Sequence, residues 1–377
     1  MSRYHQPPLG EAISCTGRAW QIGGPAHAIA DAAGTQTAHN PACGQLLGPS
    51  QPIPPARPRS YVERPLTRRN VMRLRRPRFR GIRTPVVTPR QSARRLVLLA
   101  IGSAALVVLF WAGTTQTVVG QRIADLILYG RVAADLAVLG AATEALAAVS
   151  LAFVATAALG TVTLALARGG FGLATAVVVL LVGANLTAQG LKPLLERPNL
   201  LGDVAYATGN SFPSGHVTLA SSLGLACILV VPRRIRTPVA GVAATLIAVV
   251  GVSTIIAGWH RLADVEGGML ISLAWASLAT AILVRAQGWI PRRTWGRGLG
   301  GRATTIAGAV GAVAVILGAV GIAFAVVDAT PLAELIATRS PASGTFVSAL
   351  AIAVGSSLIA CAGYVWAMRG VALELPG

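Results

Sequence analysis

Eight long apolar stretches constrain the fold of this chain more than any other feature. A helix that crosses the ~30 Å hydrocarbon core of a bilayer needs about 20 mostly apolar residues. Eight stretches have roughly this length and composition, and they cover residues 96–113, 144–167, 171–191, 216–232, 238–257, 264–284, 303–327 and 346–367. The sequence therefore predicts an all-α integral membrane protein.

Residues 118–142 are less apolar than the eight stretches, because charged residues interrupt them. Arg122, Asp125, Arg131 and Asp135 stand among Ile, Leu and Val residues there. This pattern predicts an amphipathic helix that lies in the membrane interface rather than across the bilayer.

The first 95 residues differ from the rest, since they hold 16 Arg, three acidic residues and few large apolar side chains. Such a segment has little apolar surface to bury, so we expect a disordered basic tail. Basic tails can bind nucleic acid, but Arg residues just before a spanning helix are more typical of contact with anionic lipid head groups. Met72 is an alternative first residue of the chain.

The distribution of basic residues predicts the orientation, because cytoplasmic loops collect Arg and Lys. With a cytoplasmic N-terminus, 26 Arg and Lys residues fall on the cytoplasmic side and six on the other side. The cytoplasmic segments include the tail (1–95) and a basic loop (285–302). The outer ends of the third, fourth and fifth spans then share the extracytoplasmic face of the cell membrane.

The four cysteines indicate neither a disulfide framework nor a metal site. None of them belongs to a Cys-x-x-Cys pair. Cys15, His27, His39 and Cys43 are conceivable zinc ligands, but their spacing matches no common ligand pattern.

Lysine and histidine are concentrated at the outer ends of the predicted spans. The chain has 31 Arg but a single Lys, Lys192, which indicates a position that requires a compact ammonium group. Outside the tail the only His residues are His216 and His260. One ionisable residue at a helix end is usually just interfacial, but two His, the only Lys and an Asp on one face indicate a site.

His216 ends the motif Pro213-Ser214-Gly215-His216, at the entry to a predicted span. The first backbone N–H groups of a helix favour an anion, and glycine allows a phosphate to approach closely. A helix cap by Ser214 would explain the serine without any ligand.

The second histidine, His260, is followed four residues later by Asp264. On a helix this spacing would place the carboxylate beside the ring and leave the other ring nitrogen unprotonated and nucleophilic. A purely structural His–Asp pair is the alternative. Lys192 and Arg197 supply two cations at the end of the third span, which suits the charge of a phosphate.

These motifs resemble the signature of the type 2 phosphatidic acid phosphatase (lipid phosphate phosphatase) superfamily, as found in a bacterial branch. The family pattern is Lys-x6-Arg-Pro, Pro-Ser-Gly-His and Ser-Arg-x5-His-x3-Asp, on a six-helix core. The matching residues are Lys192, Pro213, Ser214, Gly215, His216, Ser253, His260 and Asp264. Asn199 and Thr254 stand where the family has Arg. Arg197 can serve in place of the first arginine, whereas Arg261 is a weak candidate for the second.

The resemblance implies a six-helix phosphatase core over residues 96–284, followed by two additional helices within residues 303–377. It also implies hydrolysis of a lipid phosphate or polyprenyl diphosphate through a phosphohistidine, without metal or cofactor. In that mechanism His260 attacks phosphorus, Asp264 orients it, and His216 transfers protons. Four groups would bind the phosphate oxygens: Lys192, Arg197, Ser214 and Gly215.

Two other functions fit parts of the pattern. A phosphotransferase of the same fold would use a lipid or sugar hydroxyl in place of water. A catalytically inactive lipid-binding scaffold or transporter would be compatible with Asn199 and Thr254, although the presence of Lys192, His216 and His260 favours an enzyme. The sequence does not indicate an oligomeric state.

Overall fold

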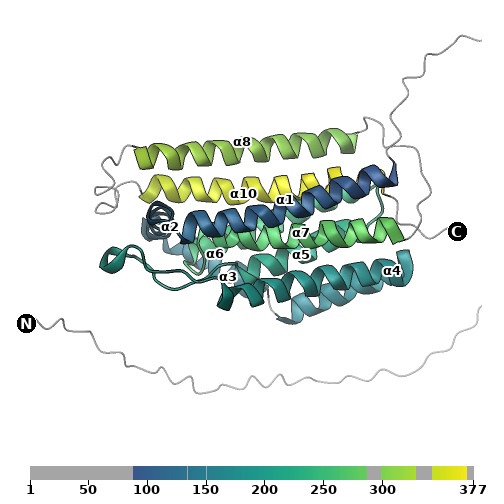
Figure 1. Ribbon diagram of the computed structural model, residues 1–377, viewed down its shortest axis with the longest axis horizontal. Helices are drawn as coiled ribbons and strands as arrows, with labels where there is room; N and C mark the ends of the chain where they lie inside the picture. The colour runs from purple at the N-terminus through teal and green to yellow at the C-terminus, as the bar shows by residue number, and fades with distance from the viewer. Residues whose placement is uncertain (1–87, 134, 150, 287–298, 328–341, 372–377) are drawn as a thin grey trace, which may run out of the picture. The chain divides into compact units, whose positions relative to one another are not determined.

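The computed structural model describes residues 88–133, 135–149, 151–286, 299–327 and 342–371, and these residues form helices and connecting loops without a β-strand. The elements are α1 (Pro89–Thr115), α2 (Val118–Gly130), η1 (Arg131–Ala133), α3 (Leu136–Ala148), α4 (Leu151–Leu194), η2 (Gly202–Val204), α5 (Gly215–Val230), α6 (Arg236–Ile256), α7 (Leu262–Ala286), α8 (Leu299–Val327) and α10 (Ala342–Ala367). Figure 1 shows that the axes of the long helices are roughly aligned with one another. Residues 1–87 of the predicted tail and residues 287–298 of the predicted basic loop lie outside the described residues.

The first helix begins earlier than its hydropathy indicates. Thr88 accepts a hydrogen bond from the backbone N–H of Gln91 (3.2 Å), and the Gln91 side chain accepts one from the backbone N–H of Thr88 (3.0 Å). This reciprocal capping box satisfies N–H groups that a helix start leaves unpaired. The prediction that residues 89–95 belong to a disordered tail was therefore wrong, because α1 starts at Pro89.

Helix α4 contains two of the predicted spans. Gly170 has non-helical backbone angles (φ 63°, ψ −162°) that divide it into two arms. Three side-chain contacts join the arms to α5: Thr161 to Cys227, Arg168 to Val230, and Asn185 to Ser222. In both arms, the residues near Gly170 lie beside the C-terminal end of α5, and the residues farther from Gly170 lie closer to the start of α5. The chain reverses at Gly170, as two separate spans require.

The predicted interfacial helix over residues 118–142 is not one helix. Helix α2 ends at Gly130, η1 follows, and α3 begins after Asp135, whose carboxylate accepts a hydrogen bond from the N–H of Ala137. Arg122 and Asp125 of α2 are buried. The single amphipathic helix was therefore a wrong prediction, because the chain breaks after α2 and the charges of α2 point into the protein.

Six of the described helices are long and apolar enough to cross a membrane. With the two arms of α4 counted separately and the shorter α5 included, each of the eight predicted spans has a helix. Helix α7 is the most buried of the six. Helix α10 packs against α6, α7 and α8, whereas α8 exposes most of its surface, so the two additional helices lie against the core through α10.

Candidate active site

His260 lies in the short connection between α6 and α7, and Asp264 lies in the first turn of α7. Nδ1 of His260 is 3.4 Å from Oδ2 of Asp264, which is long for a hydrogen bond but within the distance of an ion pair. The same oxygen accepts hydrogen bonds from Ser211 Oγ (2.5 Å) and the backbone N–H of Arg261 (2.8 Å). The two residues therefore meet as expected, but through a loop and not along a helix.

The motif from Pro213 to His216 forms the entry to α5. Ser214 is its N-cap, and the serine Oγ accepts a hydrogen bond from the N–H of Val217 (3.4 Å). The backbone N–H of Ser214 donates to the carbonyl oxygen of Asp264 (2.9 Å). Because Ser214 is fully buried, its hydroxyl acts as a helix cap here, and a role in phosphate binding stays a prediction.

Two glycines of α7 let this turn approach the helix closely. A Cβ atom at Gly267 would lie 2.5 Å from the ring of Phe212, and one at Gly268 would lie 2.6 Å from the carbonyl oxygen of Ser214. The turn that carries His216 is thus fitted against the helix that carries Asp264. Sequence analysis missed this pair, whose signal is two adjacent glycines shortly after Asp264.

The ring centroids of His216 and His260 are 6.3 Å apart. Trp259 lies beside His216, with 5.5 Å between the centroids. From the end of α4, Lys192 places its Nζ 3.7 Å from where a Cβ atom of Gly215 would be. The structure therefore brings both histidines, the only lysine and the glycine of the second motif to one end of the helices.

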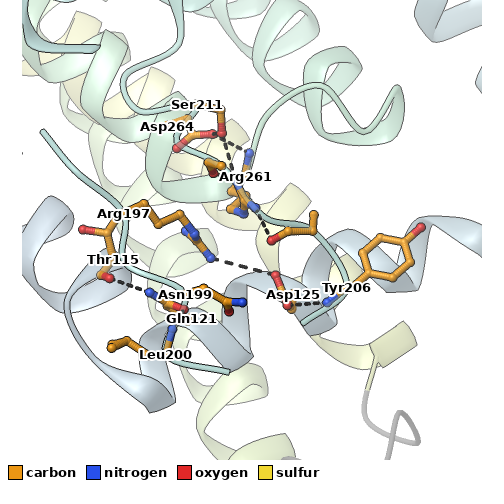
Figure 2. A network of polar contacts seen from close by, with 12 residues as sticks. Thr115, Gln121, Asp125, Arg197, Asn199, Leu200, Tyr206, Ser211, Arg261 and Asp264 are labelled. Atoms are coloured by element: carbon orange, nitrogen blue, oxygen red, sulfur yellow. Dashed lines mark hydrogen bonds and ion pairs between the residues drawn. The ribbon is translucent and has the colours of Figure 1, made fainter. Parts of the chain in front are cut away.

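Arg197 forms a buried ion pair at the edge of this cluster, as Figure 2 shows. Its Nη2 is 3.9 Å from Oδ1 of Asp125, and the two side chains are 5% and 0% exposed. Burial and the nearby charge of Arg261 lower the pKa of Arg197, whereas Asp125 and Asp264 act in the opposite direction. Asp125 was not predicted as a site residue, although an acid within an apolar stretch of α2 is a signal for it.

Helix α2 also holds the segment that follows α4. Nε2 of Gln121 donates to the carbonyl oxygens of Thr115 (2.7 Å) and Pro198 (2.6 Å), and its Oε1 accepts from the N–H of Leu200 (3.2 Å). These contacts position the backbone around Arg197 (Figure 2). Nothing in the sequence pattern pointed to Gln121.

Asn199 and Thr254, which stand where the family pattern has Arg, form local hydrogen bonds. Nδ2 of Asn199 donates to the carbonyl oxygen of Gly202 (3.2 Å). Thr254 is buried, and its Oγ1 donates to the carbonyl oxygen of Gly251 (2.7 Å). The guanidinium of Arg261 donates to three oxygens, namely those of the Ala207 and Gly209 carbonyls and the Ser211 hydroxyl. Arg261 therefore holds the loop over residues 207–211 instead of replacing the cation missing at Thr254.

A cavity of about 210 Å³ opens beside His260. Its walls are the loop over residues 207–211, the turn over residues 258–261, and Leu128 of α2.

In the part of the chain that the structure describes, no three His, Cys, Asp or Glu side chains form a group suited to a metal ion. Cys227 and Cys361 are both free thiols. Cys15, His27, His39 and Cys43, the conceivable zinc ligands, lie outside the described residues.

Comparison with known families gives one match. Residues 145–287 match the family model described as the PAP2 superfamily, and all seven predicted site residues lie within this range. No curated protein and no solved structure gives a significant match to the chain. The molecule is thus a multi-pass membrane protein of a phosphatase type. The part of the chain that matches the PAP2 superfamily is residues 145–287.

Proposed function

We propose that the protein is a membrane phosphatase that hydrolyses a lipid phosphate or a prenyl diphosphate through a phosphohistidine at His260. The observation that carries the proposal is the approach of Asp264 to Nδ1 of His260, with His216 across from the same ring. A carboxylate beside one ring nitrogen stabilises a proton there and leaves the other nitrogen, Nε2, as a nucleophile.

In the first step Nε2 of His260 attacks phosphorus, and the bond from phosphorus to the lipid oxygen breaks. His216 in its protonated form gives a proton to that oxygen, so the lipid leaves as a neutral alcohol from a monophosphate. Asp264 stabilises the positive charge that develops on the phosphorylated ring. A phosphohistidine and a neutral His216 remain.

In the second step the neutral His216 accepts a proton from water, and the water oxygen attacks phosphorus. The bond between phosphorus and Nε2 breaks, and its electron pair returns to His260. Inorganic phosphate leaves, and both histidines regain their starting protonation states. The same residue thus acts as acid and then as base.

Cations and backbone donors would bind the non-bridging oxygens of the phosphate. Lys192 lies near Gly215 at the start of α5, where the first N–H groups of the helix have no partner within the helix. Together with Arg197 and the Ser214 hydroxyl they would stabilise the charge of the transition state. We propose that this set neutralises the phosphate without a metal ion.

A lipid substrate fits a site at the ends of spanning helices. Trp259 is 49% exposed beside His216, and exposed Trp residues are common at the level of lipid head groups. The substrate would keep its chains in the bilayer and present its phosphate to the two histidines. The excess of Arg on the opposite side supports a cytoplasmic N-terminus, an extracytoplasmic site, and contact of the tail with anionic lipids.

The test is phosphate release by the purified full chain from phosphatidate, phosphatidylglycerol phosphate and polyprenyl diphosphate. We expect release with EDTA present, and its loss in His260→Ala. Arg302→Gln, at an exposed position of α8, is the control that should retain activity. A requirement for added metal, or full activity in His260→Ala, would contradict the mechanism.

The same assay separates hydrolysis from transfer to an alcohol. A hydrolase releases inorganic phosphate when water is the only acceptor. A phosphotransferase would need an added lipid or sugar hydroxyl, and an inactive scaffold would bind the lipid without incorporating radiolabelled phosphate at His260.

A further inference from the structure

Gln189 lies on α4 near the start of α5, and the proposed mechanism does not use it. One turn earlier on the same face of α4, Asn185 donates a hydrogen bond to Ser222 of α5 (3.2 Å). One turn later on that face stands Lys192. The face that holds α4 against α5 thus continues to the start of α5, where Gln189 and Lys192 stand.

Two nitrogen atoms of α4 lie close to an open position at Gly215, namely the position that a Cβ atom would occupy if this residue had a side chain. Nε2 of Gln189 lies 3.2 Å from the open position, and Nζ of Lys192 lies 3.7 Å from it. A distance of 3.2 Å is tight for a carbon atom but ordinary between a nitrogen donor and an oxygen acceptor. An oxygen atom close to the open position could therefore accept hydrogen bonds from both side chains.

The amide of Gln189 is available for a ligand. Its side chain is exposed, and within the described part of the chain it makes no hydrogen bond. The nearby amide of Asn210 differs, because its Nδ2 donates to the carbonyl oxygens of Lys192 (3.1 Å) and Leu195 (2.6 Å). Asn210 thereby fixes the end of α4 beside the turn that precedes α5. The backbone near Gln189 is thus held in place, while its amide is left without an acceptor.

The guanidinium groups nearby do not serve the open position. Arg197 pairs with Asp125, and Arg261 donates to three oxygen atoms of the loop over residues 207–211. Neither guanidinium lies within 4 Å of the open position, where Lys192 supplies a positive charge and Gln189 a neutral donor. An anionic oxygen bound there would satisfy both.

We propose that Gln189 is a phosphate-binding residue, whose amide N–H group donates a hydrogen bond to the non-bridging oxygen that Lys192 binds at the open position. The inference rests on the proposed function and adds a residue to its substrate site. When His260 attacks phosphorus, negative charge in the transition state is spread over the non-bridging oxygens. Gln189 would stabilise this charge from the opposite helix.

The test measures how tightly the purified full chain binds inorganic phosphate, from the rise in Tm that a ligand of the folded state causes. The proteins compared are the wild type, three variants of Gln189 (to Ala, Glu and Lys) and Gly190→Ala. A Cβ atom at Gly190 would meet nothing within 4 Å, so Gly190→Ala is a matched control from the same turn of α4. It should bind phosphate as the wild type does.

Gln189→Ala should raise the Kd for phosphate about tenfold, the usual effect of losing a hydrogen bond to a charged group. Gln189→Glu has nearly the same shape but places a carboxylate against the anion, so the Kd should rise about a hundredfold or more. Gln189→Lys retains a donor and adds a positive charge, so it should bind phosphate at least as tightly as the wild type. In Gln189→Ala, kcat/KM should fall by the same factor for phosphatidate and phosphatidylglycerol phosphate, because the amide contacts only the phosphate.

Equal Kd values in the wild type, Gln189→Ala and Gln189→Glu would overturn the inference and leave Gln189 as a residue that only fills space beside Gly215. A Gln189→Lys variant that binds phosphate as weakly as Gln189→Ala would also contradict it. In either case, lipid hydrolysis that depends on His260 would still support the proposed function. The expected series of Kd values without hydrolysis of any lipid would keep the phosphate site and reject the enzyme. A wild type whose Tm does not rise with phosphate would reject the phosphate site at Gly215, and the inference with it.

Discussion

The region matched by the PAP2 superfamily and the helices outside it contribute different things to one site. Residues 145–287 supply His216, His260 and Asp264, whose side chains can attack phosphorus or move protons. Helix α2, which precedes this region, supplies Gln121 and Asp125, which hold neighbouring groups in place. The proposed reactive groups thus lie within the matched region, while a helix outside it supplies the ion-pair partner of Arg197 and the contacts that hold the adjoining loop.

The largest expected effect comes from the family region, in His216→Ala. Loss of a general acid and base typically lowers a rate by 10²- to 10⁴-fold, so we expect kcat for a lipid monophosphate to fall about 10³-fold. With p-nitrophenyl phosphate the leaving group needs no proton, so the first step should survive. The phosphohistidine should then accumulate, because the water that hydrolyses it lacks a base.

Rapid quenching with radiolabelled p-nitrophenyl phosphate measures that accumulation. His260→Ala is the matched control and should take up no label. Normal turnover in His216→Ala would assign proton transfer to another group and remove the main difference between the two regions.

The helices were largely predictable from the sequence, because apolar length is a local property that a bilayer requires. The start of α1 was missed because Thr88 and Gln91 form their capping box before the apolar stretch begins. The break after α2 was missed because the charges on that helix were taken as interfacial, whereas Arg122 and Asp125 are buried. Burial of a charge depends on distant partners, which spacing along the chain does not reveal.

The candidate site was likewise predictable from the sequence only in part. The meeting of Lys192, His216 and His260 follows from topology, since their helix ends were expected on one face. The ion pair of Arg197 with Asp125 could not be predicted, because it joins a loop to a helix more than seventy residues earlier. Polar loop residues such as Ser211 carry no periodic signal, so their contacts appear only once the chain is folded.

A smaller effect is expected in the helix outside the family region, from Asp125→Ala. Removing one partner of a buried ion pair costs about 3 kcal/mol of unfolding free energy, because the other charge stays buried and unpaired. The variant also removes the acceptor of the Tyr206 N–H (2.8 Å). We expect a lower Tm in detergent and reduced kcat/KM, since Arg197 would lose its position.

The double variant Asp125→Ala with Arg197→Gln should lose less stability than the two single variants together, because neither charge is then left alone. Asp203→Ala, at an exposed position of the same neighbourhood, is the matched control and should change the Tm little. Strict additivity in the double variant would mean that the pair contributes nothing, and that α2 acts on the site only through Gln121.

The smallest effect is expected where the chain is furthest from the chemistry, between α8 and α10. A Cβ atom at Gly311 would lie 2.6 Å from the carbonyl oxygen of Gly355, whereas one at Gly308 would meet only Ala362 at 3.6 Å. Gly311→Ala should therefore cost about 1–2 kcal/mol through overpacking, offset in part by the better helix propensity of Ala. Gly308→Ala should be neutral or stabilising by up to about 1 kcal/mol.

Thermal unfolding in one detergent measures the stability of both variants, and kcat/KM should change in neither. Equal Tm values for the two variants would show that α8 does not pack closely on α10, and a loss of activity in either would extend the dependence on outer helices beyond α2.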